Sequence, residues 1–510
     1  MEENWFYEAL TETYIPLLVM FRNLQNDTIQ FRLTMSLTPT LCSMLNDSFL
    51  QQRYIRHIKK LISLAEKEVK RTRYNALQNE NAKLYLDKFK MCYHLFENIW
   101  QRDLIREFRT LQDAGLLEII TCCATHGYLP NMQDNEPAVK AQIKVGVESY
   151  IKNFGCHPRG IWLPECGYYP GLEKFLFKEG LKFFFVDTHG LLLANPQPRY
   201  GVYAPLYCSE APVAAFGRDA ESSRSVWSAQ QGYPGHPAYR DFYRDIGFEL
   251  EMDYISPYID PIGLRIHTGI KYHRVTDIHS EKKEYYNRQE ALNTAAQHAG
   301  NFMFNRQLQI QHLTTLMDRP PLIVSPYDAE LFGHWWYEGP EWLNYLIRRS
   351  QCEQNSYEFI TPSDYLSLFE ENQVSEPSFS SWGEGGYSYV WLNETNSWIY
   401  HHIHQIENIM TECASQNPQV KGVKRRILNQ MARELLLSQS SDWAFIMKTG
   451  TMVHYAQKRT KEHIANFLTL YEYLKKKTVD ENCLSFLEQK NNIFAEIDYN
   501  IYCRQNVAGG

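Results

Sequence analysis

The stretch Gly160-Ile-Trp-Leu-Pro-Glu-Cys-Gly-Tyr-Tyr-Pro170 indicates the fold class of this chain. It begins as a short apolar run at residues 161–163 and turns at Pro164 into a carboxylate, Glu165. A charged group directly after a buried strand is costly unless it has a partner or a function. In barrels of parallel strands, the carboxyl ends of the strands carry the catalytic groups. The stretch therefore predicts a buried parallel strand with a functional carboxylate at its end.

A second stretch has the same design: Val324-Ser-Pro-Tyr-Asp-Ala-Glu-Leu-Phe-Gly-His334. Asp328 follows an apolar run at residues 322–324 and, like Glu165, stands among aromatic side chains. Two strand-end carboxylates surrounded by Trp and Tyr are typical of a pair that acts on a sugar ring. Simpler structural roles stay open, because Glu165 could cap a following helix and Asp328 could close an Asx-turn.

Short apolar runs that end in polar or turn residues recur along the chain. They are residues 32–37, 117–122, 161–163, 181–186, 213–216 and 322–324. Runs of this length fit parallel strands that are buried on both faces, and helical patterns separate most of them. We therefore predict the α/β class and a β/α barrel. The catalytic barrel would span residues 1–375, with a helical insertion at about 47–113 and a loop region at about 190–245, and residues 376–510 would form an all-helical C-terminal domain.

Composition restricts the possible functions. The 510 residues carry a formal net charge of −7, which argues against a nucleic-acid-binding protein, since such proteins present a basic surface. Aromatic residues make up 14% of the chain, and this excess favours carbohydrate binding. No stretch is apolar enough to cross a membrane, no basic leader opens the sequence, and the 11 Cys form no CxxC pair. We expect a cytoplasmic protein with reduced thiols and no membrane partner.

Further polar side chains follow predicted strands or turns. His126 stands in Thr125-His-Gly-Tyr-Leu-Pro130, directly after the run at 117–122. That position makes it a candidate for the same sheet edge as Glu165, and a hydrogen-bonded core histidine is the alternative. Cys208 is a weaker candidate, because buried packing is the simpler interpretation of a lone cysteine.

Two tryptophans flank a glycine-rich loop. Trp382 and Trp391 lie on either side of Gly383-Glu-Gly-Gly386. Exposed tryptophans beside such a loop suggest a stacking platform for a sugar, and burial in a core is the alternative. Asp442 lies in a Ser-rich break between two helical patterns, where an N-cap is the simpler explanation.

Sequence motifs for metal and nucleotide chemistry are absent. There is no HExxH, no Walker loop, no GxGxxG after a strand and no GxSxG. The run His401-His402-Ile-His404 fits a helix face better than a metal site. We therefore expect neither a metal nor a cofactor.

These motifs together resemble those of the α-glucan branching enzymes of glycoside hydrolase family 57. The resemblance extends over nearly the whole chain. The matching segments are Glu12-Thr-Tyr-Ile-Pro-Leu17, residues 120–130, both carboxylate stretches, Val226-Trp-Ser228, Gly232-Tyr-Pro-Gly235, Ser381-Trp-Gly-Glu-Gly-Gly386 and Ser441-Asp-Trp443.

The resemblance implies an incomplete seven-stranded β/α barrel and retaining glycosyl transfer on α-1,4-glucan, such as amylose or glycogen, with formation of α-1,6 branches. Glu165 matches the family's nucleophile, which forms the covalent glycosyl-enzyme intermediate, and Asp328 matches the general acid/base. An α-amylase-like hydrolase of the same family, or a catalytically impaired glucan-binding protein, stays open as an alternative. The positions that line the site in relatives correspond to Trp5, His126, Cys208, Arg240, Trp382, Trp391 and Asp442.

The chain departs from the family pattern at two places. The family's first strand, with its His-Ala-His-Leu-Pro-like motif, has no counterpart before Trp5, so we expect an open seam between the strands at 32–37 and 322–324. Branching members carry an aromatic residue, often Tyr, at the tip of a mobile loop over the site, whereas residues 209–225 offer only Phe216. This second difference leaves the balance of transfer and hydrolysis open, because shielding from water favours a sugar acceptor.

Overall fold

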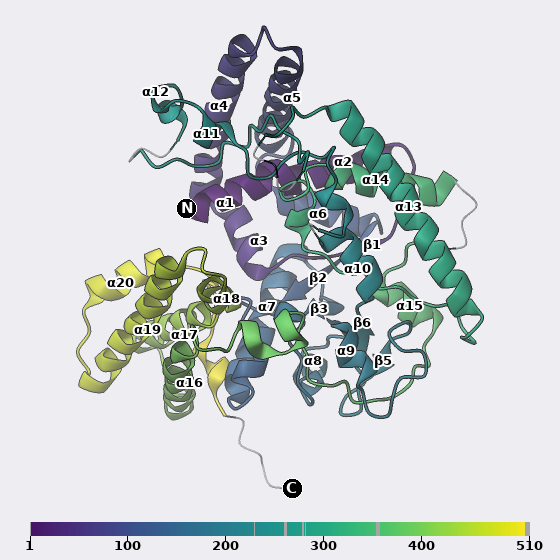
Figure 1. Ribbon diagram of the computed structural model, residues 1–510. Helices are drawn as coiled ribbons and strands as arrows, with labels where there is room; N and C mark the ends of the chain where they lie inside the picture. Colours follow the sequence, from purple (N-terminus) through teal and green to yellow (C-terminus); the bar gives the residue numbers. More distant parts are fainter. Residues whose placement is uncertain are drawn as a thin grey trace.

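The computed structural model describes residues 2–228, 230–259, 263–277, 280, 282–352 and 357–504. Within these residues the centre of the fold is a six-stranded sheet in the order β1-β2-β3-β4-β6-β5 (Figure 1). Strands β1 to β4 and β6 are parallel, and β5 pairs with β6 in the antiparallel sense. The predicted α/β class is therefore confirmed. The strands are β1 (Leu33–Ser36), β2 (Leu117–Cys122), β3 (Gly160–Trp162), β4 (Phe183–Val186), β5 (Leu206–Tyr207) and β6 (Ala214–Gly217).

The central strands form from apolar runs that are covered by helices. All four side chains of β4 are buried, and so are all four of β6. Helix α7 (Glu136–Phe154) begins where the Asn135 side chain accepts a hydrogen bond from the Ala138 N–H, and it ends at Gly155 with a φ of 72°. The helix packs tightly on the sheet at Gly146, where a Cβ atom would lie 2.2 Å from the carbonyl oxygen of Cys122.

Helices surround the sheet on several sides. The long pair α4 (Ser48–Arg71) and α5 (Ala76–Tyr93), inserted between β1 and β2, projects from the top of the molecule in Figure 1. The pair α13 (Arg288–Thr314) and α14 (Gly339–Cys352) packs together on another side. The remaining helices outside the C-terminal part are α1 (Glu2–Ala9), α2 (Ile15–Asn26), α3 (Pro39–Asn46), α6 (Leu104–Asp113), α8 (Glu173–Lys178), α9 (Thr188–Leu192), α10 (Ala220–Trp227), α11 (Ile246–Glu249), α12 (Met252–Ile255) and α15 (Pro362–Leu368).

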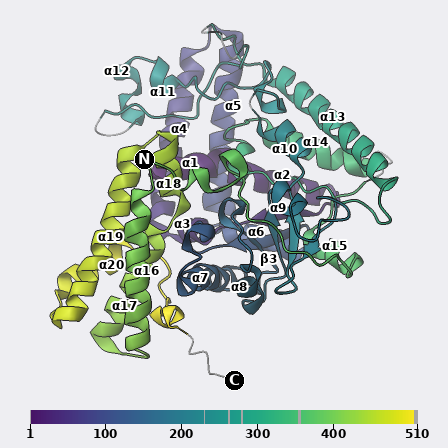
Figure 2. The same ribbon diagram turned by 60° about the horizontal axis from the view of Figure 1, so that its bottom comes forward.

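The C-terminal part is helical and packs against the sheet part through a shared apolar cluster. Its helices lie together beside the sheet in both views (Figures 1 and 2). Buried side chains such as Met410, Leu428 and Phe467 form an apolar cluster that also includes Ala138 and Val145 of α7. No helix in the described ranges combines the length and the apolar character needed to cross a bilayer. The helices are α16 (Trp398–Gln416), α17 (Gly422–Ser438), α18 (Ser441–Thr449), α19 (Val453–Lys476) and α20 (Glu481–Lys490).

The prediction of a strand at residues 322–324 is wrong, because these residues are assigned to no strand. Leu322 and Val324 still pack on an apolar cluster of the central strands that includes Phe183 and Phe216. A strand needs a ladder of backbone hydrogen bonds, whereas Val324 accepts one from Asp219, past the end of β6, and Leu322 donates one to the Tyr203 carbonyl.

Among the described residues, backbone pairing is missing between β1 and residues 322–324, and an open seam of an incomplete barrel stays a prediction at this place. In the described residues β1 is an edge strand whose one partner is β2. Leu33 N–H and Leu37 N–H donate toward β2, so by alternation the N–H groups of Thr34 and Ser36 face the seam. A cavity runs along this seam and is lined by both of its sides.

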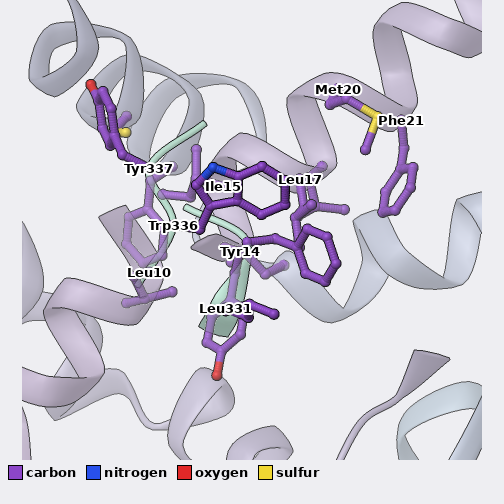
Figure 3. Packing of buried hydrophobic residues seen from close by; sticks show 14 of the residues in the cluster. Leu10, Tyr14, Ile15, Leu17, Met20, Phe21, Leu331, Trp336 and Tyr337 are labelled. Atoms are coloured by element: carbon purple, nitrogen blue, oxygen red, sulfur yellow. The ribbon is translucent and has the colours of Figure 1, made fainter. Parts of the chain in front are cut away.

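A dense apolar cluster supports the loop that carries Asp328 (Figure 3). Tyr14 and Ile15 come from the junction of a π-helical turn (Leu10–Tyr14) with α2. They pack against Leu331 and Trp336, which follow Asp328 in the chain. The N-terminal helices therefore lie directly behind one of the two predicted catalytic carboxylates.

Candidate active site

Glu165 lies in a tight turn at the end of β3. The backbone φ is 61° at Glu165 and 52° at Cys166, inside the short helical turn Pro164–Cys166. A left-handed backbone at a non-glycine residue costs of order 1–3 kcal/mol and is found most often at functional sites. His126 adopts the same conformation after β2, with a φ of 58°. Two residues that the sequence singled out therefore sit on strained strand-end turns.

Three side chains surround the carboxylate of Glu165. Trp382 Nε1 donates to Oε2 at 2.8 Å, and Ser441 Oγ lies 2.8 Å from Oε1. His126 Nδ1 lies 3.7 Å from the same Oε1. The backbone adds a further link, because the Trp382 N–H donates to the Glu165 carbonyl at 3.0 Å. The carboxylate is thus held in one orientation by groups from distant segments of the chain.

Asp328 lies in an environment that differs from that of Glu165. Burial raises the pKa of its carboxyl to about 7, and the negative charges of Glu330 and Glu165 add to the effect. His126 and Arg218 act in the opposite direction on the same pKa. A carboxyl with a pKa near 7 can donate and accept a proton at neutral pH, as a general acid/base must.

A cavity of about 1260 Å³ opens beside these groups. Its lining includes His126, Trp162, Asp328, Glu330 and Trp382, together with β1 and residues 322–324. Ligand pockets of proteins commonly measure about 300–1,000 Å³, so this space can take an extended ligand. Tryptophan side chains in the lining offer flat apolar faces of the kind that stack on sugars.

Three predicted substrate-binding side chains are buried elsewhere. Trp391 is 1% exposed and stacks on Tyr128, with ring centroids 4.7 Å apart. Cys208 belongs to an apolar core cluster. Arg240 Nη1 forms a buried ion pair with Glu12 Oε1 at 3.0 Å. The contacts of the described residues bring none of the three to either carboxylate of the pair, and their predicted roles in substrate binding gain no support from this geometry.

Two further predicted residues are exposed. Trp5 lies on α1 and is 47% exposed. Asp442 is the second residue of α18 and follows Ser441, which reaches Glu165. Contact of Trp5 and Asp442 with a substrate stays a prediction. Across the described ranges, no group of three or more His, Cys, Asp and Glu side chains is arranged to hold a metal ion.

Two residues of this site, Ser441 and Arg218, are not among the predicted site residues. Arg218 directly follows β6, its Nη1 lies 3.5 Å from Asp187 Oδ2, and its guanidinium carbon lies 5.9 Å from the centroid of the Trp382 ring. The strand-end rule that identified Glu165 could have identified Arg218 as well. Ser441 lies in the family-like segment Ser441-Asp-Trp443, but its contact could not be read from that segment, because its partner Glu165 is 276 residues away in the sequence.

Known protein families match both parts of the chain. Residues 1–378 match the model for glycosyl hydrolase family 57, and residues 402–502 match the model for the C-terminal domain of 1,4-alpha-glucan branching enzymes. A 1,4-alpha-glucan branching enzyme from Thermococcus kodakarensis is 32% identical over 99% of this chain and 76% of its own length. Two sequences from strains of Mycobacterium tuberculosis, both described as a probable 1,4-alpha-glucan branching enzyme, are 28% identical over 90% of this chain and 86% of their own length.

Solved structures agree with this match over the full length. A structure described as a novel alpha-amylase from Thermotoga maritima has a TM-score of 0.93 and is 46% identical, over 99% of this chain and 95% of its own. The family 57 branching enzyme from Thermococcus kodakaraensis has a TM-score of 0.88 and is 31% identical, over 99% of this chain and 93% of its own. This chain therefore belongs to glycosyl hydrolase family 57 and carries the C-terminal domain of the 1,4-alpha-glucan branching enzymes.

Proposed function

We propose that this protein is a 1,4-α-glucan branching enzyme that works with retention of configuration. Glu165 attacks the anomeric carbon of an α-1,4-linked glucose while Asp328 protonates the departing glycosidic oxygen. The product of this step is a glycosyl ester on Glu165 and a free non-reducing chain end. Asp328 then accepts the proton of a 6-hydroxyl group on an acceptor glucan, whose oxygen displaces Glu165 and forms the α-1,6 bond.

The contrast between the two carboxyl groups carries this proposal. Glu165 has the Trp382 N–H and the Ser441 hydroxyl directed at its two oxygens, which suits an ionised carboxylate that only accepts hydrogen bonds. Asp328 has a pKa raised to about 7 and can hold a proton at neutral pH. Two carboxyl groups whose environments differ in this way are the pattern of a nucleophile and an acid. Retention requires a separation of about 5–5.5 Å between the two carboxyl groups. The Glu165 charge is one of the causes that raise the pKa of Asp328, so the two groups interact.

The proposed catalytic unit is a β/α barrel that is open at the seam. It would span residues 1–375, and residues 376–510 would form the helical domain that contributes Trp382, Ser441 and Asp442 to the site. The grouping of the C-terminal helices around one apolar cluster, which α7 borders, supports this division. The unpaired edge of β1 supports an incomplete rather than a closed barrel.

An α-amylase-like hydrolase is the second candidate function. It is favoured by the 46% identity to the structure from Thermotoga maritima that is described as an alpha-amylase. The absence of Tyr from residues 209–225 also favours it, because less shielding of the glycosyl-enzyme gives water access.

Incubation with amylose separates the two candidates. Branching lowers the iodine absorbance without a matching rise in reducing ends, and a debranching enzyme then releases new short chains from the product. Hydrolysis lowers the absorbance with an equivalent rise in reducing ends, and the debranching enzyme releases nothing. Binding of amylose without any product would instead favour the impaired glucan-binding protein and refute both catalytic candidates.

Matched variants connect the reaction to the proposed residues. Glu165→Gln should abolish every product while the fold is kept, because the two side chains have nearly the same shape. Glu394→Gln changes an exposed carboxylate outside the site and should react as the parent protein does. Retained turnover in Glu165→Gln would refute the role of Glu165 as nucleophile.

A further inference from the structure

The hydroxyl group of Ser441 lies between Glu165 and His126. Its Oγ is 2.8 Å from Glu165 Oε1 and 2.8 Å from His126 Nδ1. The direct separation of His126 Nδ1 and Glu165 Oε1 is 3.7 Å, which is too long for a good hydrogen bond. Ser441 is itself buried, with 2% exposure. The serine hydroxyl is therefore the bridge between these two side chains.

The chemistry of the three groups determines the direction of both hydrogen bonds. An ionised Glu165 can only accept, so the single hydroxyl proton of Ser441 goes to its Oε1. The Ser441 oxygen is then free to accept a proton from His126 Nδ1. This arrangement requires the tautomer of His126 that carries hydrogen on Nδ1, and it leaves Nε2 of the neutral ring as an acceptor.

Ser441 does not use its hydroxyl for its own helix. It is the first residue of α18, and the preceding N-cap residue, Ser440, makes no side-chain capping hydrogen bond. Helix capping is the ordinary task of a serine at the N-cap, one residue before Ser441, where the side chain satisfies free N–H groups of the first turn. The Ser441 hydroxyl points instead at a carboxylate from the other end of the fold.

The start of α18 is fastened to the turn that carries His126. The Ser441 N–H donates to the His126 carbonyl at 2.9 Å, and Gly127 and Ser440 form an antiparallel bridge. Next to this bridge, Gln142 Nε2 donates to Gln439 Oε1 at 2.9 Å. The position of the serine hydroxyl is therefore set by backbone and side-chain contacts between the helical part and the sheet.

We infer that Ser441 is a positioning residue for catalysis: it holds the carboxylate of Glu165 in its attacking orientation and holds His126 in the Nδ1–H tautomer. The inference rests on the proposed function in taking Glu165 as the nucleophile. It further implies that the site is complete only while the helical part is docked, because both side-chain donors to Glu165, Trp382 and Ser441, lie beyond residue 375.

Three variants of the full chain test the role of Ser441 in turnover on amylose. Ser441→Ala should lower kcat by about 10- to 100-fold with KM changed little, since a hydrogen bond to a charged group is lost while the substrate-binding surfaces stay. Ser441→Thr keeps a hydroxyl and should recover most of the rate. Ser438→Ala is the control, because Ser438 is also buried in the helical part but donates to the Leu435 carbonyl of its own helix. Equal rates for Ser441→Ala and Ser438→Ala would overturn the inference.

Two measurements test the inference independently of turnover. Nitrogen NMR of ¹⁵N-histidine-labelled protein should find His126 with hydrogen on Nδ1 in the parent protein and in Ser438→Ala, and a loss of this preference in Ser441→Ala. Labelling of Glu165 by a water-soluble carbodiimide, followed by peptide mass spectrometry, should be faster in Ser441→Ala than in Ser438→Ala.

The outcomes separate the two proposals. If the parent protein gives no product from amylose, the proposed function fails, and the NMR and labelling results still decide the role of Ser441. If Ser441→Ala is folded by thermal unfolding yet leaves the His126 tautomer and Glu165 labelling unchanged, the positioning role is refuted, whatever the activity of the parent protein.

Discussion

Glu330 offers a direct test of Asp328 as the acid/base. Its carboxylate lies two residues beyond Asp328 and accepts a hydrogen bond from the Tyr14 hydroxyl. The substitution Glu330→Gln removes a negative charge but keeps an oxygen for Tyr14. That charge is the second cause, after burial, of the raised pKa of Asp328, so the pKa should fall in this variant.

The size of the effect follows from the causes of the raised pKa. The pKa of Asp328 rises from 3.8 to about 7, through burial first, then Glu330 and Glu165. A single like charge close to a carboxyl group changes its pKa by roughly one unit, which corresponds to about 1.4 kcal/mol. Asp328 must be protonated to act on the glycosidic oxygen, and it is protonated below its pKa. The alkaline limb of kcat/KM should therefore move to lower pH by roughly one unit, with about a tenfold loss at pH 8 and little change at pH 5.

The assay is the pH dependence of kcat/KM on amylose between about pH 5 and 9. Glu394→Gln removes an exposed carboxylate elsewhere and serves as the charge-matched control. Thermal unfolding at each pH ensures that only folded protein is compared. An alkaline limb that stays in place in Glu330→Gln, or moves to higher pH, would refute the assignment of Asp328 as a carboxyl whose proton is held by burial and neighbouring charge.

Three other substitutions test the site and its support. Trp382→Phe removes the N–H that donates to the nucleophile at 2.8 Å and should lower kcat on amylose about 10- to 100-fold, whereas Trp398→Phe, outside the site, should keep the parent rate. Gly333→Ala would put a Cβ 1.8 Å from a backbone carbonyl oxygen at a φ of 107°, so the free energy of unfolding in urea should fall by several kcal/mol. Gly450→Ala, at a φ of 78° with open space around it, should lower it by only about 1 kcal/mol. Equal losses in the two variants would contradict this reasoning. Burial raises the pKa of Glu407 to about 8 from a usual value of 4.5, so the folded protein binds this proton more tightly and its stability falls as pH rises from about 4.5 to 8. Glu407→Gln should therefore raise the thermal unfolding temperature at pH 8 more than at pH 5, and the same change at both would count against it.

Much of the sheet could be predicted from short windows of sequence. β1 to β4 and β6 form at the predicted apolar runs. A short apolar run bounded by turn residues is the local sequence pattern of a buried strand. The run at 322–324 has the same local pattern but forms no strand, since a strand also needs a partner. Whether a partner lies within reach along the whole run depends on distant segments of the chain, and no window around residue 323 contains this information.

The carboxylates Glu165 and Asp328 carry their signals within about ten residues of sequence, as acidic groups placed where apolar runs meet turns. The local sequence does not show that the two carboxyl groups have different environments. The pKa of Asp328 depends on burial and on the charge of Glu165, 163 positions earlier in the chain. Likewise, Trp391 has the local surroundings of an exposed stacking residue, but packing against Tyr128 buries its indole.

The sequence by itself determined the α/β class, most strand positions, the pair of candidate carboxylates and, through its long motifs, the family. Only the tertiary structure decided which side chains meet those carboxylates. The contact of Ser441 with Glu165 joins residues 276 positions apart, and the ion pair of Arg240 with Glu12 joins residues 228 apart. Strand formation responds mainly to neighbours along the chain, whereas hydrogen-bond geometry, burial and electrostatic coupling depend on how distant elements pack.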